Sequence, residues 1–337
     1  MRILQAAALA VLLTAGGASA QEYTFKFQSS DPAGNINFNF QQGWTNLVRE
    51  KTDGRVEIEL LPVGSVVEYN ETLDAVAAGI IDGQICDSSY WAGKDPAFGL
   101  ISNPVGAWSS PEQMIDFVEN GGGKEIMQEL LGSYGLHFIG VSTPGLEAFV
   151  SRVPLNGVAD LEGLKMRSPE GPIANVFAAA GASPVNLPSA EVFTALDKGV
   201  VDAADYSVFS VNQAQGMNDI APNPVYPGFH SLPLVEVSMN AAKWDALPDD
   251  IKAILEETVK EFQQTQLEGN READLAAVAK ARENSKITVH DWSPEERAKF
   301  RALGVAEWEK IAAQSPMAQR VYDTLTAYLI DKELLRQ

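Results

Sequence analysis

The side chains that could do chemistry in this chain are few. Its 337 residues include three histidines, His137, His230 and His290, and one cysteine, Cys86. The histidines show neither i, i+4 pairing nor the HExxH pattern of a zinc site, and the GxSxG, GxxxxGKS/T and GxGxxG motifs do not occur. No enzymatic active site is indicated, although the 45 acidic residues could supply a carboxylate pair in many ways.

Arg167 is the strongest candidate for a binding residue. It ends the stretch GLKMR, which predicts a short strand, and a Ser-Pro-Glu-Gly turn follows. A guanidinium in this position either pairs with an acid of the same chain or offers its planar fork to an external carboxylate, and the sequence leaves both interpretations open. The formal net charge of −20 disfavours nucleic acid and anionic membranes as partners, so a local cation matters most for a small anionic ligand.

The first segment of the chain is expected to be removed. Residues 1–20 combine one basic residue, an apolar run and a final Ala-Ser-Ala, which is typical of a secretory signal peptide cut after Ala20. The apolar run is too short to span a bilayer, and no later stretch approaches the ~20 apolar residues of a membrane helix. We therefore expect an exported protein.

The elements that must position Arg167 form two lobes. The remaining chain exceeds the ~250–300 residues at which a single core stops growing. Alternating strand and helix patterns predict α/β lobe I from residues 21–145 together with 234–250, and α/β lobe II from residues 146–233. Residues 249–337 predict one long helix followed by C-terminal helices. The lobes are expected to be joined by crossing strands.

The C-terminal part carries three local predictions. The helical pattern after Pro248 runs for ~35 residues, and at ~1.5 Å per residue such a helix must span both lobes. The stretch KITVHDW, residues 286–292, predicts a strand, and the two helices after it are expected to pack beside the long helix. In lobe II, Ser189 is expected to cap the helix of SAEVFTALDKG.

Several stretches together resemble one known family. These are TDGRVEIELLPVGSV, SRVPLNGVADLEG, GLKMR and VFTALDKGVVDAADYS, and they resemble the DctP-type solute-binding proteins of TRAP transporters. YWAGKDPAFGL and VYPGFHSLP are most similar to the branch that binds 2-oxo acids and related small monocarboxylates. The resemblance implies a two-lobed periplasmic binding protein fold of the α/β class, with a ligand cleft between the lobes. It also implies TRAP membrane permease subunits as partners.

The resemblance assigns roles to residues of the cleft. Arg167 matches the arginine that grips the substrate carboxylate. Asp205 and Tyr206 match positions that help hold a sodium or calcium ion, which bridges to the substrate in that branch. The glutamine and asparagine that complete this cation site align on Leu146 and Ser142.

Leucine cannot coordinate a hard cation, which wants oxygen ligands. Glu147, the next residue, would serve only if the strand register shifted by one, and such a shift normally turns a side chain to the other face. The metal site is therefore an open hypothesis with Asp205, Tyr206 and Glu147 as its ligands. Alternatively, Glu147 and Asp205 contact a positively charged or hydroxylated part of the ligand directly.

Aromatic residues are expected around the cleft. Tyr90, Tyr206 and Phe229 lie within stretches that match the family, and Trp91 and Phe209 lie beside them. For each of the five the alternative is ordinary core packing, and this alternative is strongest for Trp91 and Phe209. An aromatic lining would suit a ligand with an apolar body or a cationic group.

The expected function is capture of a small organic acid in the periplasm by hinge closure, with delivery to the permease. A periplasmic ligand sensor is an alternative that the sequence does not separate from transport. A periplasmic enzyme is a third hypothesis, but it would need an activated base near Arg167, and no histidine is expected there. Whether the protein forms a homodimer is left open.

Overall fold

The computed structural model describes residues 21–335 apart from 169–170 and 188–190. The predicted signal peptide, residues 1–20, and the predicted helix cap Ser189 lie outside the described residues. None of the described helices combines the length and the apolar content that a membrane span requires.

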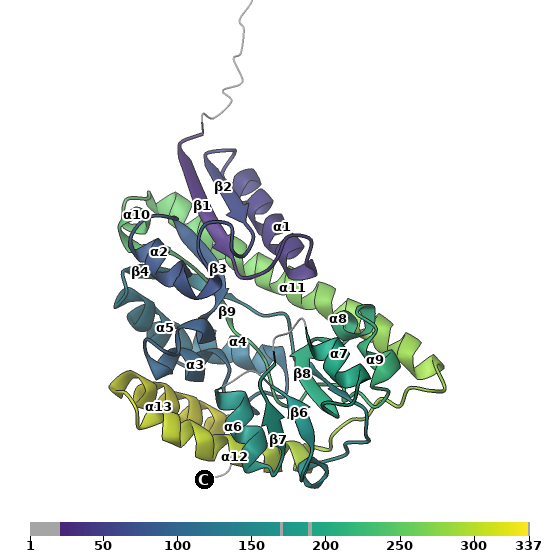
Figure 1. Ribbon diagram of the computed structural model, residues 1–337. Helices are drawn as coiled ribbons and strands as arrows, with labels where there is room; N and C mark the ends of the chain where they lie inside the picture. Colours follow the sequence, from purple (N-terminus) through teal and green to yellow (C-terminus); the bar gives the residue numbers. More distant parts are fainter. Residues whose placement is uncertain (1–20, 169–170, 188–190, 336–337) are drawn as a thin grey trace, which may run out of the picture.

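Lobe I is built on a five-stranded sheet with the order β2-β1-β3-β9-β4. β1 pairs in parallel with β2 and β3, whereas β9 pairs antiparallel with β3 and β4. Because β9 follows lobe II in the sequence, the chain must return to complete this sheet (Figure 1). The strands are β1 (Tyr23–Ser29), β2 (Val56–Leu61), β3 (Gly83–Asp87), β4 (Leu136–Ser142) and β9 (Val235–Asn240).

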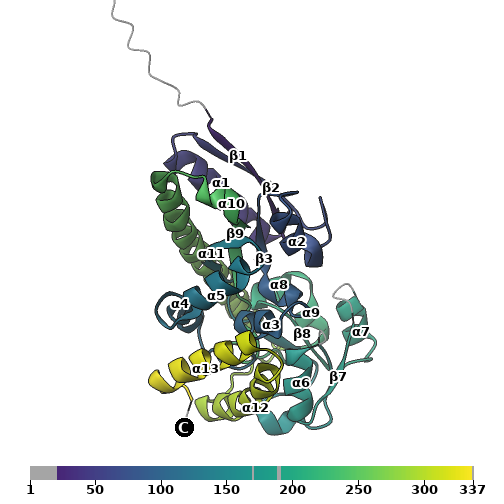
Figure 2. The same ribbon diagram turned by 90° about the vertical axis from the view of Figure 1, so that its left-hand side faces the viewer.

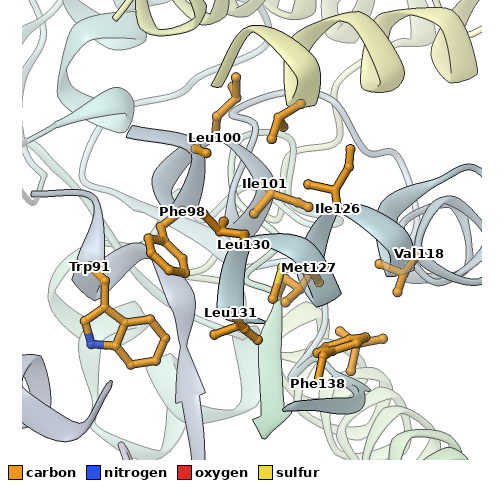
Figure 3. Packing of buried hydrophobic residues seen from close by; sticks show 14 of the residues in the cluster. Trp91, Phe98, Leu100, Ile101, Val118, Ile126, Met127, Leu130, Leu131 and Phe138 are labelled. Carbon is orange, nitrogen blue, oxygen red and sulfur yellow. The ribbon is translucent and has the colours of Figure 1, made fainter. Parts of the chain in front are cut away.

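Helices cover both faces of this sheet, and each face has its own core. In β4, the side chain of Phe138 belongs to the core beneath α3 and α5, whereas Ile139 belongs to the core beneath α1 and the long helix. Figure 3 shows part of the first core, in which Phe98 and Leu130 pack together. The helices of lobe I are α1 (Ile36–Lys51), α2 (Thr72–Ala77), α3 (Pro96–Ser102), α4 (Pro111–Asn120), α5 (Gly123–Gly132) and α10 (Ala241–Asp245), with short 3-10 turns at Tyr69–Glu71 and Ser88–Trp91.

Lobe II is built on a four-stranded sheet with the order β5-β8-β6-β7. β6 lies in the middle and pairs in parallel with both β7 and β8, while β5 pairs antiparallel with β8. The carboxyl ends of β6 and β8 therefore meet at one edge, where Arg167 ends β6. The elements are β5 (Ala148–Ser151), a 3-10 turn (Val158–Leu161), β6 (Lys165–Arg167), α6 (Pro172–Ala179), β7 (Ser183–Val185), α7 (Val192–Asp197), β8 (Ala203–Ser207), α8 (Phe209–Ala214) and α9 (Met217–Ile220).

The predicted long helix is confirmed as α11 (Asp249–Glu283), 35 residues long. It contacts both lobes, as Figure 1 shows. On the lobe I side, Gln263 Nε2 donates to the carbonyl oxygen of Val141 at 2.9 Å. On the lobe II side, the carboxylate of Asp274 accepts from the backbone N–H of Ser210 at 2.7 Å.

The C-terminal helices pack differently from the prediction. α12 (Pro294–Ala312) and α13 (Pro316–Asp331) lie against α3, α5 and α6, at the end of the molecule away from most of α11 (Figure 2). Arg301 of α12 helps to fix them, because its guanidinium donates to the carbonyl oxygens of Gly106 at 3.0 Å and Leu334 at 2.7 Å. This pairing is long-range in sequence, so periodicity could not reveal it.

The strand predicted for residues 286–292 does not form. His290 makes only an isolated bridge with Val225. The backbone N–H groups of Thr288 and His290 donate to the carbonyl oxygens of Pro222 and Pro224, respectively. Since prolines have no N–H to donate in return, a regular ladder cannot extend along this segment.

Two extended segments cross between the lobes beside each other. They are residues 143–147, between β4 and β5, and residues 230–234, before β9. The backbone N–H of Glu147 donates to the carbonyl oxygen of Ser231 at 3.0 Å. Gly228 approaches so closely that a Cβ there would overlap the carbonyl oxygen of Glu147. The crossing segments thus hold Glu147 at the junction of the lobes.

Candidate ligand-binding site

A cleft of about 720 Å³ lies between the two lobes. A smaller cavity of about 350 Å³ shares several lining residues with it, so the two form one continuous space. The polar and aromatic side chains of the larger cavity come from both lobes. They are Ser30, Tyr69, Asn70, Asp87, Ser89, Tyr90 and Asn103 of lobe I, and Glu147, Arg167, Asp205, Tyr206 and Ser231 of lobe II and the crossing segments.

Arg167 is held in this cleft by main-chain oxygens. Its Nε donates to the carbonyl oxygen of Leu187 at 3.0 Å, and its Nη1 donates to the carbonyl oxygen of Asp205 at 2.6 Å. No carboxylate among the described residues forms an ion pair with it. The two main-chain contacts orient the guanidinium and leave donors of Nη1 and Nη2 for a ligand. Of the two interpretations open from the sequence, this geometry supports the external carboxylate.

Glu147, Asp205 and His230 form a compact polar cluster next to Arg167. One ligand atom from each lies within 4.8 Å of the others. Asp205 Oδ1 and His230 Nε2 are 2.8 Å apart, and both side chains are buried. Asp205 connects the cluster to Arg167, because its backbone oxygen contacts the guanidinium while its side chain contacts the imidazole.

The two carboxyl groups of the cluster hold their protons differently. Burial raises the pKa of Glu147 well above its usual range, and the nearby Asp205 carboxylate adds to the rise. Burial would also raise the pKa of Asp205, but the hydrogen bond with His230 and the positive charge of Arg167 outweigh burial and lower it. Glu147 therefore keeps its proton to a higher pH than Asp205 does. Because ionised Asp205 can only accept, His230 Nε2 is the donor in this pair.

His230 is the main residue that sequence reasoning missed. The expectation that no histidine lies near Arg167 is wrong, since His230 contacts Asp205 directly. The stretch VYPGFHSLP resembles the family, and Phe229 is the only residue in it that the sequence predicts for the cleft. His230 directly follows Phe229 in this stretch, and that position is the sequence signal that could have identified it as a residue near the cleft. Tyr69, Asn70 and Asn103 also line the cleft and were not predicted.

The aromatic predictions divide into two groups. Tyr90 and Tyr206 line the cleft, and Tyr69 joins Tyr90 there with ring centroids 4.8 Å apart. Trp91, by contrast, is buried against Phe98, 5.6 Å between centroids, as Figure 3 shows. Its indole therefore stabilises lobe I and does not line the cleft.

Phe209 and Phe229 are likewise core residues, which corrects the prediction for both. Phe209 packs against Tyr226 at 5.4 Å between centroids, and Phe229 stacks on Trp292 at 3.8 Å. Both phenylalanines are almost fully buried, and neither is among the residues that line the cleft. Trp292 lies in the segment before α12, so the C-terminal part of the chain draws Phe229 into the core.

Ser142 and Leu146 do not face the cleft. Ser142 is buried, and its hydroxyl donates to Gln266 of α11. Leu146 packs against the core of lobe I. Glu147 lines the cleft without any slip of a strand, because β4 ends at Ser142 and residues 143–147 have no regular strand alternation.

Two α/β lobes, joined by crossing segments around a cleft with an oriented guanidinium, define a two-lobed protein that binds an anionic ligand. The model of the DctP family, described as bacterial extracellular solute-binding protein, family 7, matches residues 27–315. The chain belongs to this family, whose members are extracytoplasmic solute-binding proteins.

Solved structures and curated relatives agree with this assignment. A TRAP periplasmic solute-binding protein of Rhodobacter sphaeroides, in an apo open structure, is 68% identical, with a TM-score of 0.88 over 93% of this chain and 100% of that chain. The monocarboxylate 2-oxoacid-binding periplasmic protein of a Nostoc species is 28% identical over 79% of this chain and 76% of its own length. A TRAP protein of Colwellia psychrerythraea with bound calcium and pyruvate shares the fold, at 23% identity and a TM-score of 0.78 over 93% of this chain and 95% of that chain. The predicted two-lobed fold and family are confirmed.

Proposed function

We propose that this protein captures a small organic acid in the periplasm and delivers it to the membrane subunits of a TRAP transporter. The observation that carries the proposal is Arg167, whose guanidinium is oriented by two main-chain oxygens inside the cleft. A preoriented guanidinium matches a carboxylate with two parallel hydrogen bonds. Residues 1–20 would direct export before they are removed.

The relatives indicate which acids to try first. The Nostoc relative is named for monocarboxylate 2-oxo acids, and the Colwellia structure contains pyruvate. Small 2-oxo acids and related monocarboxylates are therefore the first candidates for this chain. The cleft volume of about 720 Å³ leaves room for a larger body beside the carboxylate.

Binding would couple to closure of the two lobes. Arg167 and Tyr206 lie on lobe II, whereas Tyr69 and Tyr90 lie on lobe I. A ligand that contacts both groups stabilises the closed arrangement over the open one. The two crossing segments, residues 143–147 and 230–234, are short and extended, so they can absorb the rotation. No bond in the ligand needs to break.

Two alternatives share this site. A periplasmic sensor would use the same cleft and differ only in the protein that reads the closed form. An enzyme would use His230 and Asp205 as an acid–base pair, and it predicts a chemically altered ligand after incubation. Recovery of the bound acid unchanged by mass spectrometry supports transport or sensing. A homodimer stays a hypothesis that light scattering of the purified protein tests.

Thermal melting tests the carboxylate site. The protein is refolded to remove carried-over ligand and then melted with 2-oxo acids, hydroxy acids, aromatic acids, sugar acids and zwitterions. A ligand at a hundred times its Kd adds about 2.7 kcal/mol of stability, which raises the melting midpoint measurably.

Arg167→Ala should abolish this rise. Arg152→Ala is the matched control, because Arg152 is also on lobe II but pairs with Asp202 and does not line the cleft. A rise that survives in Arg167→Ala, or no rise with any acid, contradicts the proposed function.

A further inference from the structure

The family resemblance implies a calcium or sodium ion that bridges protein and substrate. The residues of the cleft show whether ligands for such an ion are present. Calcium takes about six to eight oxygen ligands in proteins. The cluster here offers two carboxyl groups and one imidazole. Imidazole nitrogen suits transition metals rather than hard cations.

Atoms of the cluster that could ligate a metal already form hydrogen bonds within the protein. Asp205 Oδ1 accepts from His230 Nε2 at 2.8 Å, and the backbone oxygen of Asp205 accepts from Arg167 at 2.6 Å. Since Nε2 donates its hydrogen, it has no lone pair for a metal. The Arg167 guanidinium beside this carboxylate also opposes a second positive charge.

The positions that should complete the cation site do not supply oxygens to the cleft. The side chain of Leu146 packs in the core of lobe I, and the hydroxyl of Ser142 is bonded to Gln266 of α11. Across the cleft, Asp87 Oδ1 accepts from the backbone N–H of Ser89 at 2.8 Å and from the Ser102 hydroxyl at 2.5 Å. The donor set does not fit a bridging calcium or sodium ion.

We propose that Glu147 and Asp205 contact the ligand directly, without a bridging metal, and select an organic acid with a hydrogen-bond donor next to its carboxylate. This inference rests on the proposed function and narrows its ligand. Arg167 binds the carboxylate, and His230 holds the Asp205 carboxylate toward the cleft. The donor on the ligand is a hydroxyl or an ammonium group.

The preference for a hydrogen-bond donor follows from the charge around the polar group that lies next to the carboxylate of the ligand. A bridging cation presents positive charge, so it suits the oxygen of a 2-oxo group, which can only accept. Without the cation, the same position faces the lone pairs of the Asp205 carboxylate. An oxo oxygen would be repelled there, whereas a hydroxyl or an ammonium group donates.

Acids that share one carbon skeleton distinguish direct contact with the cluster from contact through a bridging metal. Wild-type protein, stripped of ligand, is titrated calorimetrically with 2-oxo, 2-hydroxy and 2-amino acids of one carbon skeleton, such as pyruvate, lactate and alanine, and then with the phenyl-substituted set. Each titration is run in sodium-free buffer with EDTA and again with calcium. We expect a 2-hydroxy or 2-amino acid to bind at least about tenfold more tightly than its 2-oxo partner, a difference of ~1.4 kcal/mol, with EDTA present. Hydroxyl and ammonium ligands are told apart by which member binds.

Two outcomes overturn the inference and leave the proposed function intact. One is binding of the 2-oxo acid that depends on calcium. The other is binding of other acids while no hydroxy or amino acid binds. Failure of all acids in both this set and the melting panel removes the proposed function first. Calcium alone should give no heat with the protein, and a saturable heat also overturns the inference.

Glu147→Gln provides a second test of the same cluster. The amide keeps the shape and one acceptor oxygen of Glu147 and cannot ionise, whereas a bound cation would need the carboxylate form. We expect a loss of affinity of about tenfold or less, because one hydrogen bond is altered, and binding that stays independent of calcium. A loss on the order of a hundredfold that excess calcium partly restores indicates a metal ligand. Glu57→Gln, on the outer strand β2 and away from the cleft, is the matched control.

Discussion

Glu236 offers a sharp test of the electrostatics inside lobe I. It is the second residue of β9 and is fully buried between β3 and β4. Its Oε1 accepts from Gln84 Nε2 at 2.6 Å. Burial raises the pKa of Glu236 from 4.5 to about 8, although its hydrogen bonds with Ser238 and Gln84 oppose the rise. The carboxyl group is therefore neutral in the folded protein under mildly acidic and neutral conditions.

This shift makes the free energy of unfolding depend on pH. Below pH 4.5 Glu236 is protonated in both states and has no effect. Between 4.5 and about 8 the unfolded chain releases the proton while the folded protein keeps it, so stability falls with rising pH by about 1.4 kcal/mol per unit. Above that range the loss levels off at about 5 kcal/mol, since the folded pKa exceeds the unfolded one by some 3.5 units.

Glu236→Gln should remove this dependence, because the amide keeps an acceptor for Gln84 and cannot ionise. We expect the stability of the variant relative to wild type to increase by roughly 3 kcal/mol between pH 5 and pH 7.5. The measurement is urea unfolding of both proteins at each pH, followed by fluorescence. Glu59→Gln, an exposed carboxylate in β2 of the same sheet, is the control and should show no such change. A Glu236→Gln difference that stays constant over this pH range refutes the reasoning.

Three further predictions follow from packing. Phe229→Ala should lower the free energy of unfolding of the ligand-free protein by roughly 3–5 kcal/mol in urea unfolding, because the ring of Phe229 is stacked on Trp292. An unchanged free energy of unfolding would indicate that Phe229 lines the cleft and is not a core residue. Gly140→Ala should cost roughly 1–3 kcal/mol in the same assay, since its Cβ would come within 2.6 Å of Val259 Cγ1 on α11. Cys86, fully buried and with its pKa raised well above the usual range by burial, should react with Ellman's reagent only after unfolding, and rapid reaction in the native protein contradicts this burial.

The parts of the fold that sequence could predict are those set by local pattern. The long helix follows from apolar residues repeated at helical spacing, and the structure forms it as α11. Arg167 could be placed at a strand end because Met166 before it is apolar and a turn follows, and the structure ends β6 there. Each of these features depends on residues within a few positions of one another.

The missed features depend on contacts between distant residues. His230 lies in the second crossing segment and Asp205 in β8, so the two residues are 25 positions apart in the sequence and meet only in the folded protein. Phe229 looked like a cleft residue because the packing of Trp292 and the C-terminal helices onto lobe II is invisible in any local window. Glu147 was doubted because strand alternation was assumed to continue past Ser142, where the strand in fact ends.

The attachment of α11 gives the protein a way to set its affinity through residues that do not themselves line the cleft. Asn270 bonds to the carbonyl oxygen of Pro144 at 3.1 Å, and one turn further on Asp274 bonds to Ser210 of the other lobe. Rotation of the lobes must therefore bend the helix or shift contacts within this single turn. The observed dissociation constant equals the intrinsic one divided by the fraction of molecules in the binding-competent form. Substitutions in that turn can thus alter how much acid is bound at a given concentration while every residue that touches the acid stays the same.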